Sequence, residues 1–185
     1  MKKSLFVLSI ALLGTLLSSN VIGQNFATTA LTLGMPQLNL LSSISGPISL
    51  QLTTTIAGEA VEASKSDSTA RLRISSVIAE AKPRTLSAKV SAGVPAGTLL
   101  KLEAKNPTGA TFGGTKGVYS GIVTLSESDA NIITGIGSCY SGTATDDGYK
   151  LKYTWALIGG LGSYADVRAT AGASVTVTLT LSAPL

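Results

Sequence analysis

Residues that could carry out chemistry are few in this 185-residue chain, which has no histidine and a single cysteine, Cys139. The missing histidine removes the commonest general base and any Ser-His-Asp or Cys-His arrangement. Because Cys139 has no second cysteine to pair with in the chain, we expect it to act as a small buried hydrophobic side chain. A disulfide between two chains is the alternative interpretation.

Acidic residues come close together in sequence at only two places, Glu127/Asp129 and Asp146/Asp147. The second pair directly precedes Gly148 at the start of an expected strand, and Asp-Gly in that position is ordinary turn chemistry. The first pair lacks the glycine and the final acid that a calcium loop needs. We therefore predict no catalytic residues, no metal site and no cofactor.

Two glycine-rich stretches resemble nucleotide-binding motifs by chance. "GLGSYA" (residues 160–165) fits the dinucleotide fingerprint, and "GATFGGTKG" (residues 109–117) nearly spells a P-loop. Both motifs work only when a helix follows and presents its N-terminus to the phosphates. No helical pattern follows either stretch, so we predict that both are loops.

Apolar and polar residues alternate with a period of two along most of the chain. This is the pattern of antiparallel strands with one buried face and one solvent-exposed face. The clearest alternating segments are residues 47–55, 70–77, 84–92, 98–104, 148–157 and 174–182.

Gly, Pro, Asn and Asp punctuate these segments, as turns require. "GVPAG" (residues 93–97) joins two alternating runs, which predicts a hairpin that pairs Lys89 with Glu103 and Val90 with Leu102. "SESDANII" (residues 126–133) suggests the one short helical turn.

Eight to ten short strands with turn-like breaks predict an all-β fold, an antiparallel two-sheet sandwich of immunoglobulin-like architecture. A β-barrel is the alternative. We find no internal repeat and no linker, so residues 24–185 are expected to form a single β-sandwich domain.

Residues 1–23 have the organisation of a secretory signal peptide, with Lys2 and Lys3 before the apolar run "LFVLSIALLGTLL". That run is too short to span a membrane, and no later segment could do so. Two of the 14 basic residues lie in this leader, so the remaining 12 are nearly balanced by 10 acidic residues. This near-neutral charge disfavours nucleic acid as a partner.

Aromatic residues are the remaining candidates for ligand contacts. Tyr149, Tyr153 and Trp155 share the apolar face of one expected strand, so we expect them to fill the core; an aromatic platform for a sugar is the alternative. Three further tyrosines lie in or near expected loops and are the candidate surface contacts: Tyr119, Tyr140 and Tyr164.

The stretch "LSESDANIITGIGSCYSG", the later "GYKLKYTW" and the terminal "VTVTLTLS" resemble a recurring type of small exported β-sandwich protein in the Bacteroidota. The upstream "RTLSAKVSAGVPAGTLLKLEA" fits the same pattern. This resemblance implies export and a sandwich fold, and it transfers no functional residues. The C-terminal strand also looks distantly like that of chaperone–usher pilins, although the pilin disulfide has no counterpart here.

These observations favour a non-enzymatic, exported protein of the cell surface or periplasm with a structural or adhesive role. Its expected partners are other copies of itself, a surface protein or a glycan. One alternative is a carbohydrate-binding module that uses the loop tyrosines. Another is a fibre subunit that accepts a strand from a neighbour. Such a subunit would carry a free N-terminal extension, and the weak alternation of residues 25–34 does not decide the question.

Overall fold

The computed structural model describes residues 29–79, 82–107, 111–170 and 172–182. Pro36–Leu185 form one compact unit, and residues 29–35, which precede it, have no regular secondary structure. The predicted signal peptide and its cleavage site lie outside the described residues. No helix in the described ranges is long and apolar enough to cross a membrane.

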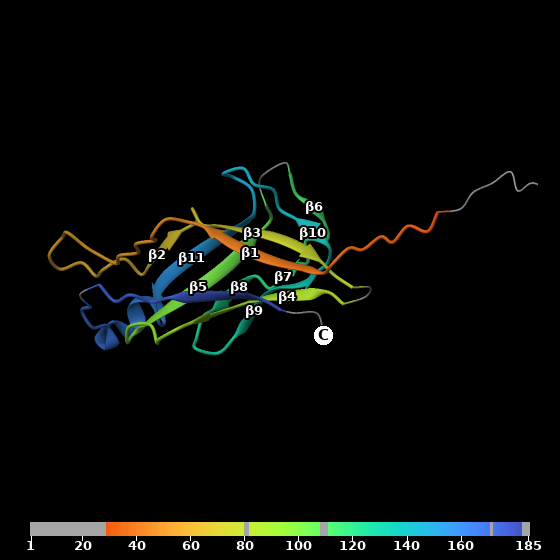
Figure 1. The fold of residues 1–185 in the computed structure, drawn as a ribbon. Helices are drawn as coiled ribbons and strands as arrows, with labels where there is room; N and C mark the ends of the chain where they lie inside the picture. The colour runs from red at the N-terminus through yellow and green to blue at the C-terminus, as the bar shows by residue number, and fades with distance from the viewer. Residues whose placement is uncertain (1–28, 80–81, 108–110, 171, 183–185) are drawn as a thin grey trace, which may run out of the picture. The chain divides into compact units, whose positions relative to one another are not determined.

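Pro36–Leu185 fold into two antiparallel sheets, as predicted (Figure 1). The sheets remain open, so the β-barrel alternative was wrong. The larger sheet follows the order β6-β10-β3-β11-β5-β8, with β1 also paired to β3 and β2 to β11. Its strands are β1 (Leu38–Ile44), β2 (Ser64–Asp67), β3 (Arg71–Val77), β5 (Thr98–Lys105), β6 (Gly113–Gly114), β8 (Ile122–Thr124), β10 (Cys139–Tyr140) and β11 (Tyr149–Leu157).

The smaller sheet follows the order β12-β4-β9-β7. Its strands are β4 (Arg84–Val90), β7 (Val118–Tyr119), β9 (Ala130–Ile136) and β12 (Val177–Leu181). A 3-10 helix, η1 (Gly160–Asp166), follows β11. Among the described residues, β1 pairs only with β3 and β12 only with β4, so each presents one free edge.

The core lies between the two sheets and consists of the inward-facing residues of both. Burial alternates residue by residue along β3, β4 and β5, which confirms the predicted inward faces of these strands. The fully buried apolar side chains include Leu72, Ile74, Leu86, Leu102, Ile132, Ile133, Ile136, Tyr149 and Leu151. Cys139 is also buried, with its thiol unpaired, as predicted for a small core residue.

The predicted hairpin between β4 and β5 was wrong. β4 pairs with β12 and β9, whereas β5 pairs with β11 and β8, so Val90 and Leu102 lie in different sheets. Alternation of apolar and polar residues shows which side chains point inward, but it does not show which strand pairs with which. The connection of residues 91–97 is long enough to cross from one sheet to the other, which keeps both inward faces in one core.

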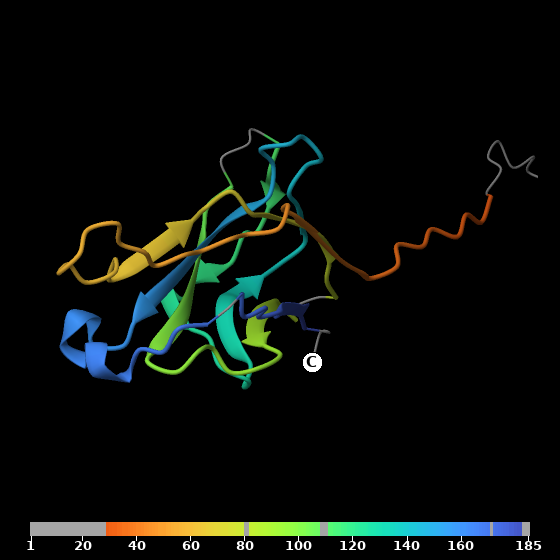
Figure 2. The ribbon, with the colours of Figure 1, turned by 90° about the vertical axis from the view of Figure 1, so that its left-hand side faces the viewer.

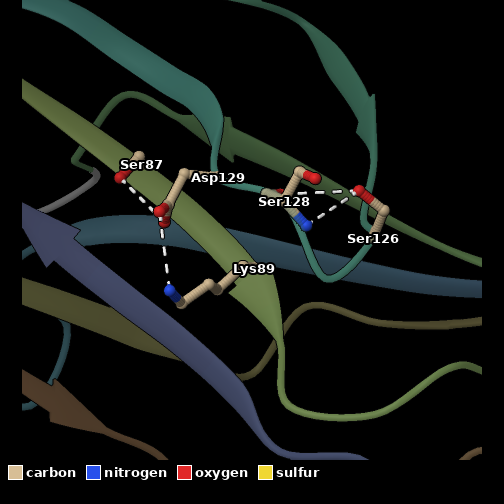
Figure 3. A network of polar contacts seen from close by, with 5 residues as sticks. All are labelled: Ser87, Lys89, Ser126, Ser128 and Asp129. Atoms are coloured by element: carbon tan, nitrogen blue, oxygen red, sulfur yellow. Dashed lines mark hydrogen bonds and ion pairs between the residues drawn. The ribbon is translucent and has the colours of Figure 1, made fainter.

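Lys89 consequently has a different partner from the predicted Glu103. Its Nζ lies 3.5 Å from Oδ2 of Asp129, whose Oδ1 accepts a hydrogen bond from Ser87 at 3.5 Å (Figure 3). The same figure shows the backbone N–H of Ser128 donating to Ser126 Oγ, at 3.3 Å. This turn leads directly into β9, so the predicted helical turn at residues 126–133 was also wrong.

The alternating segment of residues 47–55 forms no strand in the structure. Its side chains still alternate, with Ile48, Leu50 and Leu52 half-buried and the residues between them exposed. The alternation therefore predicted the buried side chains correctly, but the predicted strand, paired with a neighbour in a sheet, was wrong.

Candidate functional site

Arg84 joins the two sheets at one end of the sandwich. Arg84 is 1% exposed, and its guanidinium donates from Nη2 to the carbonyl oxygen of Leu38 in β1 at 2.9 Å. Nη1 donates to the carbonyl oxygen of Ser182, just after β12, at 3.0 Å. Nε donates to Ser76 Oγ at 3.2 Å, and nearby Asn39 donates to the carbonyl oxygen of Leu181. The free edges of β1 and β12 are thus held together at this end.

Arg84 was not among the functional residues predicted from the sequence. The sequence does contain a signal for a buried Arg84. In this strand the even-numbered residues point inward, and Arg84 is even-numbered like Leu86, Ala88 and Val90. An arginine at an inward position predicts buried carbonyl groups that need its five donors.

At some distance from Arg84, an uncharged groove of about 700 Å³, lined by both apolar and hydroxyl-bearing side chains, opens between the two sheets. Residues 45–53, which follow β1, line one side, and residues 172–177, which lead into β12, line the other. In the view of Figure 2 the orange stretch after β1 runs above and the blue-violet stretch before β12 runs below. Leu100 from β5 and Tyr153 and Trp155 from β11 also line the groove.

On one side of this groove, part of the backbone has no hydrogen-bond partner among the described residues. Residues 48–52 form no backbone hydrogen bond to any other described residue, although their side chains alternate as in a strand. Ile48, Leu50 and Leu52 all line the groove. An extended segment of this kind presents N–H and C=O groups that another strand could use.

The groove lining is nearly uncharged. Its described residues include no Asp, Glu, Lys or Arg, and the chain has no histidine. Its one titratable residue is Tyr153, whose pKa is raised to about 12 by burial. The groove can therefore offer apolar contact, aromatic faces and backbone hydrogen bonds at neutral pH.

The three aromatic residues of β11 have different surroundings. Tyr149 is fully buried, as predicted, and its hydroxyl donates to the carbonyl oxygen of Lys116 at 2.8 Å. Tyr153 and Trp155 are half-buried and pack against the core, so the prediction holds for them in part, and they also line the groove.

The structure places the three predicted contact tyrosines on three separate elements. Tyr119 in β7 is half-buried, packs edge-on against Tyr149 and donates to Asn106 Oδ1 at 2.9 Å. Tyr140 in β10 and Tyr164 in η1 are 57% and 41% exposed. The hydroxyl of Tyr164 accepts a hydrogen bond from the backbone N–H of Val61 at 3.5 Å. Within the described residues no contact brings these three side chains together.

The remaining candidates have structural roles. Asp147 is buried and accepts hydrogen bonds from the Ala144 N–H at 2.8 Å and from Thr111 Oγ1 at 3.3 Å, which fixes the predicted turn before β11. Burial raises the pKa of the Cys139 thiol, which disfavours the reactive thiolate. Across the described part of the chain, no three acidic or cysteine side chains cluster closely enough to hold a metal ion.

No protein-family model, curated protein or solved structure matches this chain. The groove between residues 45–53 and 172–177 is the candidate binding site in the described part of the chain.

Proposed function

We propose that this protein is a non-enzymatic, exported structural or adhesive subunit that accepts an extended polypeptide strand in its groove. Strand addition requires an unpaired backbone edge and pockets for alternate side chains. The unpaired, alternating segment of residues 48–52 beside an uncharged groove is the one observation that carries this proposal.

Chemistry of the groove supports a binding role over a catalytic one. General acid–base or nucleophilic catalysis requires titratable or activated groups close together. The groove offers hydroxyl, amide and apolar side chains around Tyr153, whose raised pKa keeps it protonated at neutral pH. Such a lining suits a polypeptide with apolar residues at every second position.

Export is the second part of the proposal. It is supported by the signal-peptide pattern of residues 1–23 and by a composition rich in Ser and Thr with few charges. We expect the protein to act in the periplasm or at the cell surface, with other copies of itself or another surface protein as partners.

The sole tryptophan of the chain provides a direct test, because Trp155 lines the groove. Uncharged peptides that alternate Thr with Val or Leu should shift Trp155 emission to shorter wavelength and protect it from a soluble quencher. Peptides of the same composition with the apolar residues placed consecutively serve as the control. Equal, negligible responses to both sets would contradict strand acceptance.

Carbohydrate binding is the second candidate function, because Tyr153 and Trp155 expose aromatic faces in the groove and Tyr140 and Tyr164 are exposed elsewhere. It predicts that oligosaccharides, and not alternating peptides, change Trp155 emission. If binding depends on the predicted tyrosines, the triple variant Tyr119→Ala, Tyr140→Ala, Tyr164→Ala should lose it. Binding that survives in this variant would contradict their involvement.

A further inference from the structure

The segment that precedes β1 carries three apolar side chains in strand-like spacing. Leu31, Leu33 and Met35 are 78%, 84% and 82% exposed, and each is two residues from the next. Side chains at this spacing share one face of an extended strand. Three large, exposed apolar side chains at alternate positions indicate a surface that is covered in the functional state.

Groove and segment match in chemistry as well as in spacing. Residues 24–35 contain no charged side chain, and neither does the described lining of the groove. The segment presents apolar side chains at every second position, and the unpaired residues 48–52 do the same. Two such segments can pair edge to edge with their apolar side chains on the same inward face.

Chain length argues against insertion of this segment into the groove of its own molecule. The groove lining begins at Ser45, beyond the end of β1 (Leu38–Ile44), which spans about 20 Å. Leu33 and Met35 precede Leu38 by only five and three residues, and can reach at most about 18 and 11 Å from it. Leu31, seven residues before Leu38, can reach at most about 25 Å, so the three side chains together cannot lie along residues 48–52 of the same molecule. Pairing of this segment with residues 48–52 therefore requires a second molecule.

We propose that residues 31–35 of one copy of this chain occupy the groove of a second copy, in a head-to-tail arrangement. This proposal rests on the proposed function, and names the strand that the groove accepts. Because every copy carries both a segment and a groove, the contact is heterologous and can extend into an open chain.

The test compares two double variants of the chain from residue 24 onward. Leu31→Asp with Leu33→Asp places charges on the apolar face, whereas Ala30→Asp with Thr32→Asp places the same charges on the opposite face. We expect the wild-type chain and the second variant to self-associate with increasing concentration. The first variant should be monomeric at concentrations at least about tenfold higher, as measured by analytical ultracentrifugation.

A mixing experiment establishes the direction of the contact. Leu50→Lys should block the groove and leave the segment intact, while the Leu31→Asp, Leu33→Asp chain has an intact groove. Each is expected to be monomeric alone, and their mixture should form a one-to-one complex with blue-shifted Trp155 emission. Thermal unfolding of each variant checks that it is folded.

Three results would overturn this inference. They are a wild-type chain that stays monomeric, equal association of the two double variants, and a mixture that forms no complex. If the groove still binds alternating peptides in the Trp155 assay, the proposed function survives and only the identity of the strand is wrong. If it binds none, both fail together.

Discussion

Arg84 Nη2 donates a hydrogen bond to the carbonyl oxygen of Leu38 at 2.9 Å and thereby links β4 of the smaller sheet to β1 of the larger one. The same guanidinium reaches Ser182 and Ser76, so four chain segments meet at one side chain. Replacing Arg84 leaves these oxygen acceptors, which lie around a buried side chain, without its hydrogen-bond donors. Each unsatisfied acceptor lowers the free energy of unfolding by about 1–3 kcal/mol.

Arg84→Met is therefore expected to lower the free energy of unfolding by about 2–4 kcal/mol in urea denaturation. Arg168→Met is the matched control, because Arg168 is exposed and donates only to nearby backbone carbonyl groups. It should change stability by less than about 0.5 kcal/mol. Similar effects of the two substitutions would show that Arg84 does not hold the sheets together.

Much of this fold could be predicted from alternation alone. The inward faces of β3, β4 and β5 were predicted correctly because burial of every second residue is a local property of a strand. The pairing of strands was harder to predict, because the same alternation is compatible with a hairpin or with a connection that crosses from one sheet to the other. That ambiguity produced the wrong pairing of Val90 with Leu102.

The groove could not be predicted in the same way. Residues 47–55 alternate as clearly as any paired strand, and only the three-dimensional arrangement shows that residues 48–52 have no backbone partner among the described residues. Half-burial of Tyr153 and Trp155 depends on which distant segments of the chain pack against β11, which is a long-range property. The burial of Arg84, by contrast, could have been predicted, because Arg84 occupies an inward-facing position of an alternating strand.

Val90 and Leu102 provide a test of the two-sheet core. Val90 is 2% exposed and Leu102 is fully buried, so Val90→Ala should cost about 1–3 kcal/mol and Leu102→Ala about 2–5 kcal/mol of unfolding free energy. Val118→Ala, at a residue that is 69% exposed, should cost less than about 0.5 kcal/mol. A negligible effect at Leu102 would contradict the core described here.

Lys89 distinguishes the observed strand order from a hairpin. A double-mutant cycle should show weak coupling of Lys89 with Asp129, below about 1 kcal/mol, because both side chains are solvent-exposed. It should show no coupling with Glu103, which lies in the other sheet. Coupling of Lys89 to Glu103 alone would restore the hairpin arrangement.

Cys139 should be unreactive in the folded protein. Burial raises the pKa of its thiol and shields it from reagents, so little thiolate is accessible at pH 7. Labelling by a soluble thiol reagent should be at least about 100-fold slower than in denaturant. A non-reducing gel that shows a reducible dimer of the native protein would contradict this expectation and support a disulfide between chains.

Buried tyrosines predict the loss of stability at high pH. Burial raises the pKa of Tyr119 and Tyr153 to about 12, and it raises the pKa of Tyr149 as well. In the unfolded chain these phenols ionise near pH 10, so the unfolded state loses protons first. Stability should be flat with respect to these groups below pH 10 and fall above it. Tyr153→Phe should reduce that fall, and an unchanged profile would contradict the role of its burial.

The central claim is that the groove beside residues 48–52 accepts a strand from another copy, and cross-linking tests it most directly. In a Cys139→Ala background, one chain carries Leu33→Cys and a second carries Ile48→Cys, Leu50→Cys or Leu52→Cys. Paired residues on the same face of adjacent strands lie close enough for a disulfide, so at least one combination should form a mixed dimer in high yield. Thr32→Cys, on the opposite face, should form little. If no Leu33→Cys combination exceeds the Thr32→Cys yield, the groove does not hold this strand.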